Sequence, residues 1–401
     1  MPDKSSPGNQ APLAGINVLA IEQAIAAPLC TRQLAELGAR VIKVERRETG
    51  DFARHYDGRV NGLCSHFVWT NRSKQSLTLD LKHPSALDIL FRILPKTDVL
   101  VQNLAPSATD RLGLGWGTLH DQFPRLILCN ISGYGSAGPY ADKKAYDLLV
   151  QAEAGFLSVT GTPDDMVKSG ISIADIAAGM QAHSAILAAL IQRSRTETGS
   201  CIDVSLLEAM VEWMGYPLYY AYDGAEPPPR SGADHASIYP YGAFAAADGK
   251  LIMLGLQNER EWQAFCEQVL SRADLATDPR FHDNAARSEH RDELKTIIQR
   301  QFDSWPAMQI TAKLDEAKIA YAHINDMKSV WQHPQLKSLR RIMEIDTANG
   351  PVKVFRPPGN NSSFEPVLNP VPDLGEHTDS ILVEFGFNSE EIAEFRKQQV
   401  I

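Results

Sequence analysis

Residues 16–44 read INVLAIEQAIAAPLCTRQLAELGARVIKV, and this run indicates how the chain begins to fold. The apolar segment 16–21 is rich in residues that favour strands. Pro28 suits the first turn of a helix, and apolar residues then recur at the spacing of one helical face. These residues are Cys30, Leu34 and Leu37. With a second apolar run at 41–44, the pattern predicts two parallel strands joined by a right-handed helical crossover.

The alternation of strands and helices continues through the first half of the chain. Short apolar runs predict strands at 77–81, 99–101 and 126–131, and residues 84–93 have a helical pattern between two of them. Strands that alternate with helices are typical of a parallel sheet covered on both faces. We therefore predict an α/β fold with a Rossmann-like large domain.

The second half has a different pattern. Residues 176–193 are small or apolar nearly all round, as in a buried helix. A Pro-rich stretch at 224–231 marks a domain boundary, and the Asp248-Gly249 turn beyond it predicts a hairpin. Together with several helical segments, this hairpin predicts a smaller α+β domain. The helical segments are 259–270, 291–305 and 307–317, and a charged helix follows near the C-terminus at 389–397.

Composition excludes several classes of protein. The chain has 401 residues, of which 44% are hydrophobic and 22% charged, as in ordinary globular proteins. Its net charge of −10 argues against general nucleic-acid binding. No apolar run reaches the roughly 18 residues of a membrane span. Residues 1–12 are polar and Pro-rich without an apolar signal core, so we expect a loose tail on a cytoplasmic protein.

The five cysteines are far apart and form no C-x-x-C pair. This spacing argues against disulfides and against a zinc site, so no bound metal is expected. Residues 133–138 spell G-x-G-x-x-G, but a polar segment follows instead of an apolar helix, which favours a Gly-rich loop over a dinucleotide site. The nucleophile-elbow, zinc-protease and P-loop motifs are absent, and the corresponding functions lose their main support.

The segment 169–180, SGISIADIAAGM, holds one carboxylate where an apolar run turns into the buried helix. Asp175 could cap that helix, which is the ordinary role of an aspartate at this place. It could also act as a nucleophile, with free backbone N–H groups of the helix start stabilising an oxyanion. The residues alone leave both interpretations open.

From Pro12 to Ile401 the chain resembles the class III CoA-transferases, the family of formyl-CoA transferase, carnitine CoA-transferase and α-methylacyl-CoA racemase. Each of the shared motifs is weak evidence by itself, but their order and spacing together are specific for the family. The motifs are 12–16, 26–28, 37–39, 41–45, Gly50-Asp51, Asn71-Arg72, Leu79-Asp80, Asn103, 110–113, 133–135, Tyr146-Asp147, Thr160-Gly161, Ala174-Asp175 and 374–378.

The resemblance implies that Asp175 is the nucleophile. It would attack a donor thioester to form a mixed anhydride, and then exchange with the released thiolate to give an aspartyl-CoA thioester. An acceptor acid would reverse these steps, so that one thioester replaces another without ATP. The anhydride has to be kept from water, and a closed site is expected.

The resemblance also implies which residues bind CoA, which is a substrate here and not a permanent cofactor. Arg46 would meet the nucleotide end, with Arg111 and Lys144 near phosphates. Small and apolar residues would line the adenine and pantetheine path. These residues are Ala24, Ala26, Leu79, Asn103 and Leu104. The alternative for the charged groups is an ordinary solvated surface.

Two departures from the sequences of relatives narrow the choice of reaction and of acceptor. The racemase branch has a histidine where this chain has Tyr146, next to Asp147. Racemisation needs two positioned acid–base groups, so the missing histidine disfavours a 2-methylacyl-CoA racemase or epimerase. Tyr146 and Asp147 would instead shape the acyl pocket. A protein that binds CoA without catalysis is the third alternative.

The second departure concerns the acceptor. The glycine run of formyl-CoA transferase is absent, and residues 231–241 are more like those of enzymes that move CoA between dicarboxylates. This similarity favours succinyl-CoA as donor and itaconate, glutarate, mesaconate, malate or citramalate as acceptor. The second carboxylate of such an acid needs a cationic or hydrogen-bonding partner. The candidates are His235, Arg230, Arg72 and Arg54.

Members of the family form a homodimer of interlocked chains. For this chain, the resemblance implies a large CoA-binding and catalytic domain made of residues 1–222 with 335–401. Residues 223–334 would form the small domain. Each active site would then draw on both chains.

Overall fold

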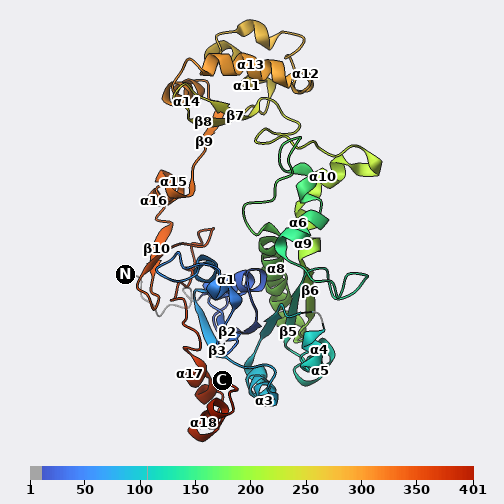
Figure 1. Ribbon diagram of the computed structural model, residues 1–401, viewed down its shortest axis with the longest axis vertical. Coiled ribbons are helices and arrows are strands. Elements are labelled where there is room, and N and C mark those ends of the chain that lie inside the picture. The colour runs from blue at the N-terminus through green and yellow to red at the C-terminus, as the bar shows by residue number, and fades with distance from the viewer. Residues whose placement is uncertain (1–10, 106) are drawn as a thin grey trace. The chain divides into compact units, whose positions relative to one another are not determined.

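The computed structural model describes residues 11–105 and 107–401, and most of the expected tail at 1–12 lies outside them (Figure 1). The chain divides into two compact units. The first comprises Met1–Ala154, Gly170–Met214 and Leu336–Ile401, and the second comprises Gly155–Ser169 and Gly215–Gln335. The expected domains differ from these units at 155–169 and 215–222. Segment 155–169 belongs to the second unit because its carbonyl groups accept hydrogen bonds from Arg230 and Gly232.

The first unit contains a six-stranded parallel sheet in the order β3-β2-β1-β4-β5-β6. This order confirms the predicted doubly wound α/β architecture, in which the topology reverses between β1 and β4. The strands are β1 (Asn17–Ile21), β2 (Arg40–Glu45), β3 (Lys74–Thr78), β4 (Val99–Gln102), β5 (Ile127–Ser132) and β6 (Cys201–Ser205).

Strand β3 begins earlier than the sequence predicts. The expected strand covered 77–81, whereas the structure has Lys74–Thr78. The polar residues Lys74 and Ser76 are buried because Lys74 pairs with Glu22 and Ser76 with Glu45. Buried polar side chains at the start of a strand break the apolar pattern on which the prediction relied.

Helices cover the sheet, and the C-terminal segment returns to it. Helix α17 lies next to β3, where the hydroxyl of Thr378 is 3.0 Å from that of Thr78 (Figure 1). The elements of this unit are α1 (Ala26–Glu36), η2 (Phe52–His55), α2 (Ser65–Asn71), α3 (Pro84–Ile93), η3 (Leu94–Lys96), α4 (Ala108–Arg111), α5 (Trp116–Gln122), α6 (Asp147–Glu153), α8 (Ile173–Thr196), α9 (Leu206–Trp213), β10 (Ile342–Ile345), β11 (Val352–Phe355), α17 (Thr378–Glu384) and α18 (Ser389–Lys397).

Helix α8 packs closely against α1. It is long and apolar enough to span a membrane, but it contacts α1, α9, β5 and β6 as a core helix of this unit. The contact with α1 depends on Gly179, because a Cβ there would lie 2.6 Å from the backbone oxygen of Ala26 and 3.3 Å from Leu29. The absence of a side chain therefore lets the first turns of both helices come together.

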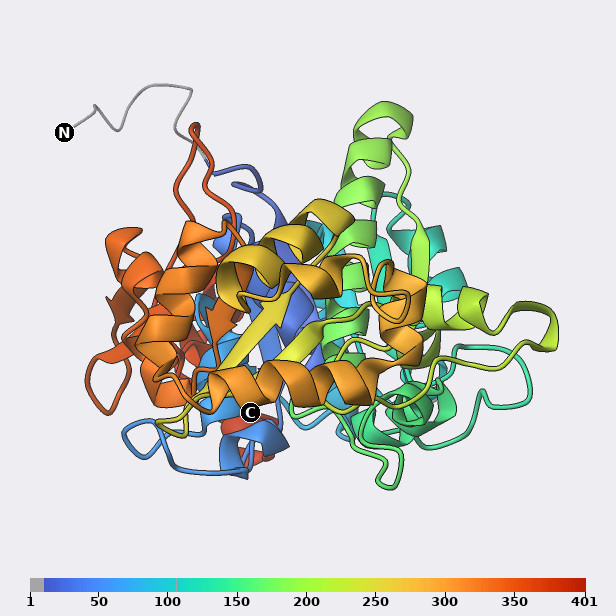
Figure 2. The ribbon, with the colours of Figure 1, turned by 90° about the horizontal axis from the view of Figure 1, so that it is seen from above.

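The second unit has its own sheet and core. Strands β7, β8 and β9 form an antiparallel sheet, and Trp262, Phe265 and Phe302 are buried in the cluster around it. Figure 2 shows the yellow strands with gold and orange helices around them. The elements are α7 (Phe156–Val159), α10 (Gly215–Tyr220), η4 (Tyr222–Gly224), β7 (Tyr241–Ala245), β8 (Leu251–Gly255), α11 (Glu259–Ala264), η5 (Phe265–Val269), η6 (Ala273–Ala276), α12 (Asn284–Glu289), α13 (Arg291–Phe302), α14 (Ala307–Glu316), β9 (Ala320–His323) and α15 (Met327–Trp331), with α16 (Pro334–Ser338) at the junction.

The α1–α8 contact predicts an inverted effect of a usually stabilising substitution. Alanine in place of glycine normally stabilises an exposed helix by about 1 kcal/mol. Gly179→Ala should instead lower the free energy of unfolding by about 1–3 kcal/mol, because its methyl group meets backbone. Urea denaturation measures this change. Gly117→Ala in α5 is the control, since no atom lies within 4 Å of the new Cβ. Equal effects of the two substitutions would contradict the close packing.

Candidate active site

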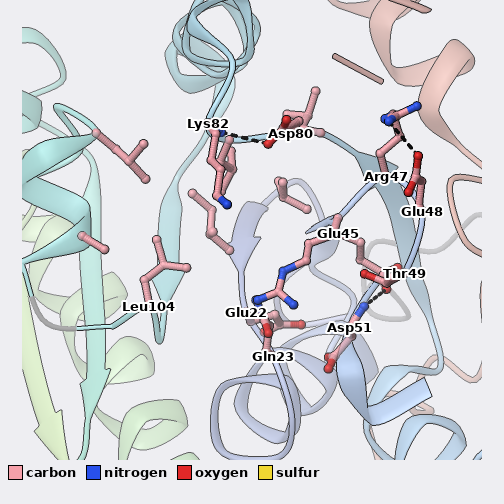
Figure 3. Close-up of a pocket in the computed structure, with 18 of the residues that line it drawn as sticks. Glu22, Gln23, Glu45, Arg47, Glu48, Thr49, Asp51, Asp80, Lys82 and Leu104 are labelled. Carbon is pink, nitrogen blue, oxygen red and sulfur yellow. Dashed lines mark hydrogen bonds and ion pairs between the residues drawn. The ribbon is translucent and has the colours of Figure 1, made fainter. Parts of the chain in front are cut away.

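A cavity of about 630 Å³ lies at the carboxyl ends of the first four strands of the first unit (Figure 3). Gln23 follows β1, Arg46 follows β2, Leu79 follows β3 and Leu104 follows β4, and all four line it. Open parallel sheets bind ligands at this edge, beside the point where the strand order reverses. The cavity is therefore the candidate ligand site of this unit.

Four of the eight residues expected to bind CoA line this cavity. Arg46 and Arg111 are exposed at it, while Leu79 and Leu104 contribute apolar surface. Arg47 and Lys82 add two more cations to the lining. The same lining includes the carboxylates of Glu22, Glu45, Glu48, Asp51 and Asp80, of which the first four form ion pairs, Glu48 with Arg47. Arg46, Arg111 and Lys82 are therefore the cations of this lining that suit a phosphorylated ligand.

The other four expected CoA residues have different surroundings. Asn103 does not line the cavity, but its side chain makes two 2.9 Å hydrogen bonds with the backbone of Gln23, which does. Ala24 follows Gln23 in the same turn, and Ala26 is buried at the start of α1. Lys144 is exposed on the loop before α6 and does not line the cavity.

The turn between β1 and α1 has a strained backbone, and a hydrogen bond with Asp51 stabilises it. Ala24 has a φ of 64°, a left-handed conformation that costs an alanine roughly 1 kcal/mol. Its N–H donates to Oδ1 of Asp51 over 3.0 Å, and Oδ2 of Asp51 is 2.8 Å from Nζ of Lys43. Asp51 thus connects the strained turn to a buried cation and fixes the wall of the cavity that Gln23 forms.

Next to this turn is a buried ionic cluster made of Glu22, Lys43, Asp51 and Lys74. Sequence reasoning did not predict this cluster. Each of these residues is at most 4% exposed. Burial disfavours a charged Glu22, but Lys74 at 2.7 Å and Lys43 outweigh it and lower the pKa of Glu22. Burial lowers the pKa of Lys74 to about 8, although Glu22 opposes the shift. Two cations and two anions balance here. A lysine within the apolar strand 41–44 was the signal that a buried partner had to exist.

Asp175 is the third residue of α8, and another aspartate caps that helix. Oδ1 of Asp147, from α6, accepts the N–H groups of Ala174 and Asp175 over 2.8 Å and 3.3 Å. The N-cap residue is Ser172, so the capping interpretation of Asp175 is wrong. Within the described parts of the chain, no residue donates a hydrogen bond to the carboxylate of Asp175.

The N–H groups of the first turn are also engaged. Those of Ala174 and Asp175 go to Asp147, and the N–H of Ile173 donates to Ile171. The expectation that free helix N–H groups stabilise an oxyanion is therefore not met in this conformation. Asp147 thus orders the start of α8, and its expected role in shaping the acyl pocket stays a prediction.

The surroundings of Asp175 destabilise its charged form. The side chain is half-buried, and burial together with the negative charge of Asp147 raises its pKa to about 7. A carboxylate with little hydration and no hydrogen-bond donor is a better nucleophile than a solvated one. Carboxylates shifted in this way are typical of functional sites.

The packing of α8 relates Asp175 to the start of α1. Asp175 lies one helical turn before Gly179, which contacts the first residue of α1. Asp175 does not itself line the cavity, whereas Gln23 and Asp51 do. Partial burial and the negative charges of Asp51 and Asp175 raise the pKa of Tyr56 to about 12. Tyr146, the residue before Asp147, is 70% exposed.

Two of the expected partners of a substrate carboxylate have structural roles in the first unit. Arg72 is buried, forms an ion pair with Glu36 and donates to the carbonyl group of Phe355. Arg54 donates to both carboxylate oxygens of Glu45 over 2.9 Å and 2.8 Å. Both arginines thus already have anionic partners within the protein.

The other two candidates belong to the second unit. Nδ1 of His235 accepts the N–H groups of Ser237 and Ile238, and its ring stacks on Tyr241. Arg230 donates to the carbonyl groups of the 155–169 segment over 2.8 Å and 2.7 Å. An arginine that binds only carbonyl groups keeps its positive charge unneutralised.

Comparisons with known proteins identify the family of this chain. The family described as CoA-transferase family III matches residues 13–378. The chain is 33% identical to an acyl-CoA transferase of Fusarium pseudograminearum, over 99% of this chain and 90% of that protein. It is 34% identical to the succinyl-CoA:glutarate CoA-transferase of Mus musculus, over 93% of this chain and 86% of the mouse protein.

A solved structure shows the same fold. The crystal structure of a CaiB/BaiF family protein from Brucella suis matches with a TM-score of 0.83 and 31% identity, over 94% of this chain and 100% of that chain. The family match covers most of the chain, and both relatives are more than 30% identical to it. The chain therefore belongs to the class III CoA-transferase family and is an enzyme of that class.

Proposed function

We propose that this enzyme moves CoA from succinyl-CoA to a small dicarboxylate. The observation that carries the proposal is the half-buried carboxylate of Asp175, whose pKa is raised to about 7 and which accepts no hydrogen bond from the described residues. The same unit holds a cavity whose lining includes Arg46 and Arg111. The name of the mouse relative, with succinyl-CoA and glutarate, supports the substrate class. Glutarate, itaconate, mesaconate, malate and citramalate are the acceptors we favour.

In the proposed reaction, an oxygen of Asp175 attacks the thioester carbon of succinyl-CoA. The C–S bond breaks, CoA leaves as a thiolate, and a mixed anhydride remains on Asp175. The thiolate then attacks the aspartyl carbonyl carbon, succinate leaves, and an aspartyl-CoA thioester forms. The acceptor carboxylate attacks this thioester and releases the thiolate again. The thiolate finally attacks the acceptor's acyl carbon and frees Asp175, so each thioester that breaks is replaced by another.

The residues that line the cavity support the following placement of the CoA molecule. Arg46 and Arg111, with Lys82, would meet the phosphates of the nucleotide end. Leu79 and Leu104 would contact the pantetheine arm on its way to the β1–α1 turn. Ala24, Ala26 and Asn103 would then act by shaping this turn, and Lys144 would approach the phosphates from the loop before α6.

The second carboxylate of the acceptor needs a partner whose charge is not already used. Arg72 and Arg54 are paired with Glu36 and Glu45, which makes them poor candidates. Arg230 binds only carbonyl groups, and Nδ1 of His235 is an acceptor in its present contacts. We therefore favour Arg230 as the cation for this carboxylate, with His235 and Tyr146 shaping the acyl pocket.

The experiment that tests the function is an acceptor panel. The protein is incubated with succinyl-CoA and single acids, and the CoA products are identified by mass spectrometry. We expect a new CoA ester with at least one dicarboxylate and slower transfer to monocarboxylates of equal length. Hydrolysis of succinyl-CoA without any transfer would contradict the proposal. Deuterium incorporation at C2 of a 2-methylacyl-CoA would support the racemase alternative instead.

The pKa of Asp175 predicts a pH profile. Only the ionised carboxylate can attack, and a pKa of about 7 keeps part of the enzyme protonated at neutral pH. Activity at low substrate concentration should therefore rise with pH and level off above about 8. Stability should change in the opposite direction, because a raised carboxyl pKa stabilises the folded protein only while the group is protonated. Asp175→Asn should consequently gain stability over the native enzyme more at pH 8 than at pH 5, and a flat activity profile from pH 5 to 8 would contradict the shift.

We also propose that two chains form an interlocked homodimer, as the family resemblance implies. In such a dimer the large domain would include the C-terminal segment, and each active site would use residues of both chains. Light scattering should then give twice the chain mass of 44.2 kDa. A monomer that is fully active at the same concentration would contradict the shared site.

A further inference from the structure

A compact group of metal-ligating side chains lies outside the CoA cavity, in the segment that leads into α2. Asp57, Cys64 and His66 each present one ligand atom, and the three atoms all lie within 4.8 Å of one another. Cys64 is buried, while the side chains of Asp57 and His66 are 24% and 41% exposed, which leaves a path from solvent. Thiolate, imidazole and carboxylate together are a ligand set that Zn²⁺ accepts.

The distances around Oδ2 of Asp57 are compatible with a tetrahedral site. Sγ of Cys64 donates a hydrogen bond to this oxygen over 3.6 Å, and Nδ1 of His66 is 3.7 Å from it, which is too long for a hydrogen bond between nitrogen and oxygen. Zinc bonds of about 2.0–2.3 Å at tetrahedral angles place neighbouring ligand atoms roughly 3.3–3.6 Å apart. The ligand atoms of Cys64 and His66 lie within 4.8 Å of each other, so metal binding requires a side-chain movement that brings the three atoms together.

Neighbouring groups already orient the carboxylate of Asp57. Its Oδ1 accepts the backbone N–H groups of Arg59 and Ser65 over 3.0 Å and 2.9 Å. The hydroxyl of Ser65 donates to Oδ2 over 2.6 Å, which leaves another lone pair of that oxygen for Cys64 and His66. Outer contacts of this kind fix ligand carboxylates in metal sites.

We propose that Asp57, Cys64 and His66 bind one Zn²⁺ ion, or a divalent metal with the same ligand preference, with water as the fourth ligand. This proposal departs from the sequence-based expectation that no metal binds, which rested on the absence of cysteine pairs. A single cysteine two residues before a histidine, with the carboxylate seven positions upstream of the cysteine, escapes such a search. The ring of His66 meets the ring of Tyr56 edge-on at 5.3 Å, so Tyr56 borders the proposed metal site.

The test uses the full-length protein, freed of metal with a chelator and titrated with Co²⁺. We expect one equivalent of Co²⁺ to give the strong visible bands of a tetrahedral complex and a near-ultraviolet thiolate charge-transfer band. Cys64→Ser should remove the charge-transfer band. Competition with Zn²⁺ should show affinity weaker by about tenfold or more in Cys64→Ser and in His66→Gln. Cys201→Ser is the control, because it removes a half-buried cysteine outside the cluster and should change neither signal.

Either of two results would overturn the proposal. One is a native protein that gives only the weak bands of octahedral Co²⁺. The other is a charge-transfer band that persists in Cys64→Ser. His66→Gln guards against misfolding of the buried cysteine variant, since His66 is partly exposed and its exchange leaves the core intact. The titration contains no acyl-CoA, so its failure would leave the proposed transferase activity untouched.

Discussion

A carboxylate that is poorly solvated and lies beside a second negative charge is the constraint on which the site depends. Asp147 uses one carboxylate oxygen to cap α8, and in doing so it leaves Asp175 without a hydrogen-bond donor and with a raised pKa of about 7. Free energy from packing elsewhere has to offset the cost of this arrangement. The close contact of α8 with α1 at Gly179 supplies such packing one helical turn after Asp175.

The wall of the cavity also combines a strained backbone with hydrogen bonds and ion pairs that offset the strain. Ala24 takes a left-handed conformation, and Asp51 compensates by accepting its N–H group while it pairs with Lys43. Because Glu22 and Lys74 complete a balanced set of charges, removal of one member would leave an uncompensated charge in the interior. The β1–α1 turn, whose residue Gln23 lines the cavity, therefore depends on this balanced set of buried charges.

Periodicity and turn residues predicted most of the fold. The crossover at 16–44 and the helices at 84–93 and 389–397 lie where the structure has them, since each has apolar spacing and clear end signals. The predicted start of β3 was wrong, and segment 155–169 falls in the second compact unit, because both features depend on contacts with residues distant in sequence. For the site, the resemblance pointed to Asp175, and half of the residues that it implied for CoA binding line the cavity. The sequence motifs could not show that Asp147 caps α8 or that Asp51 holds the β1–α1 turn, since both roles depend on three-dimensional placement.

The central claim is that Asp175 carries CoA as a covalent thioester. The most direct measurement is peptide mass spectrometry of the enzyme after brief incubation with succinyl-CoA and acid quenching, with a parallel sample trapped by hydroxylamine. The account predicts a CoA adduct on the peptide that contains Asp175, its conversion to a hydroxamate in the trapped sample, and neither product in Asp175→Asn. CoA exchange that proceeds normally while Asp175 stays unmodified, or an adduct on another residue, would contradict the account.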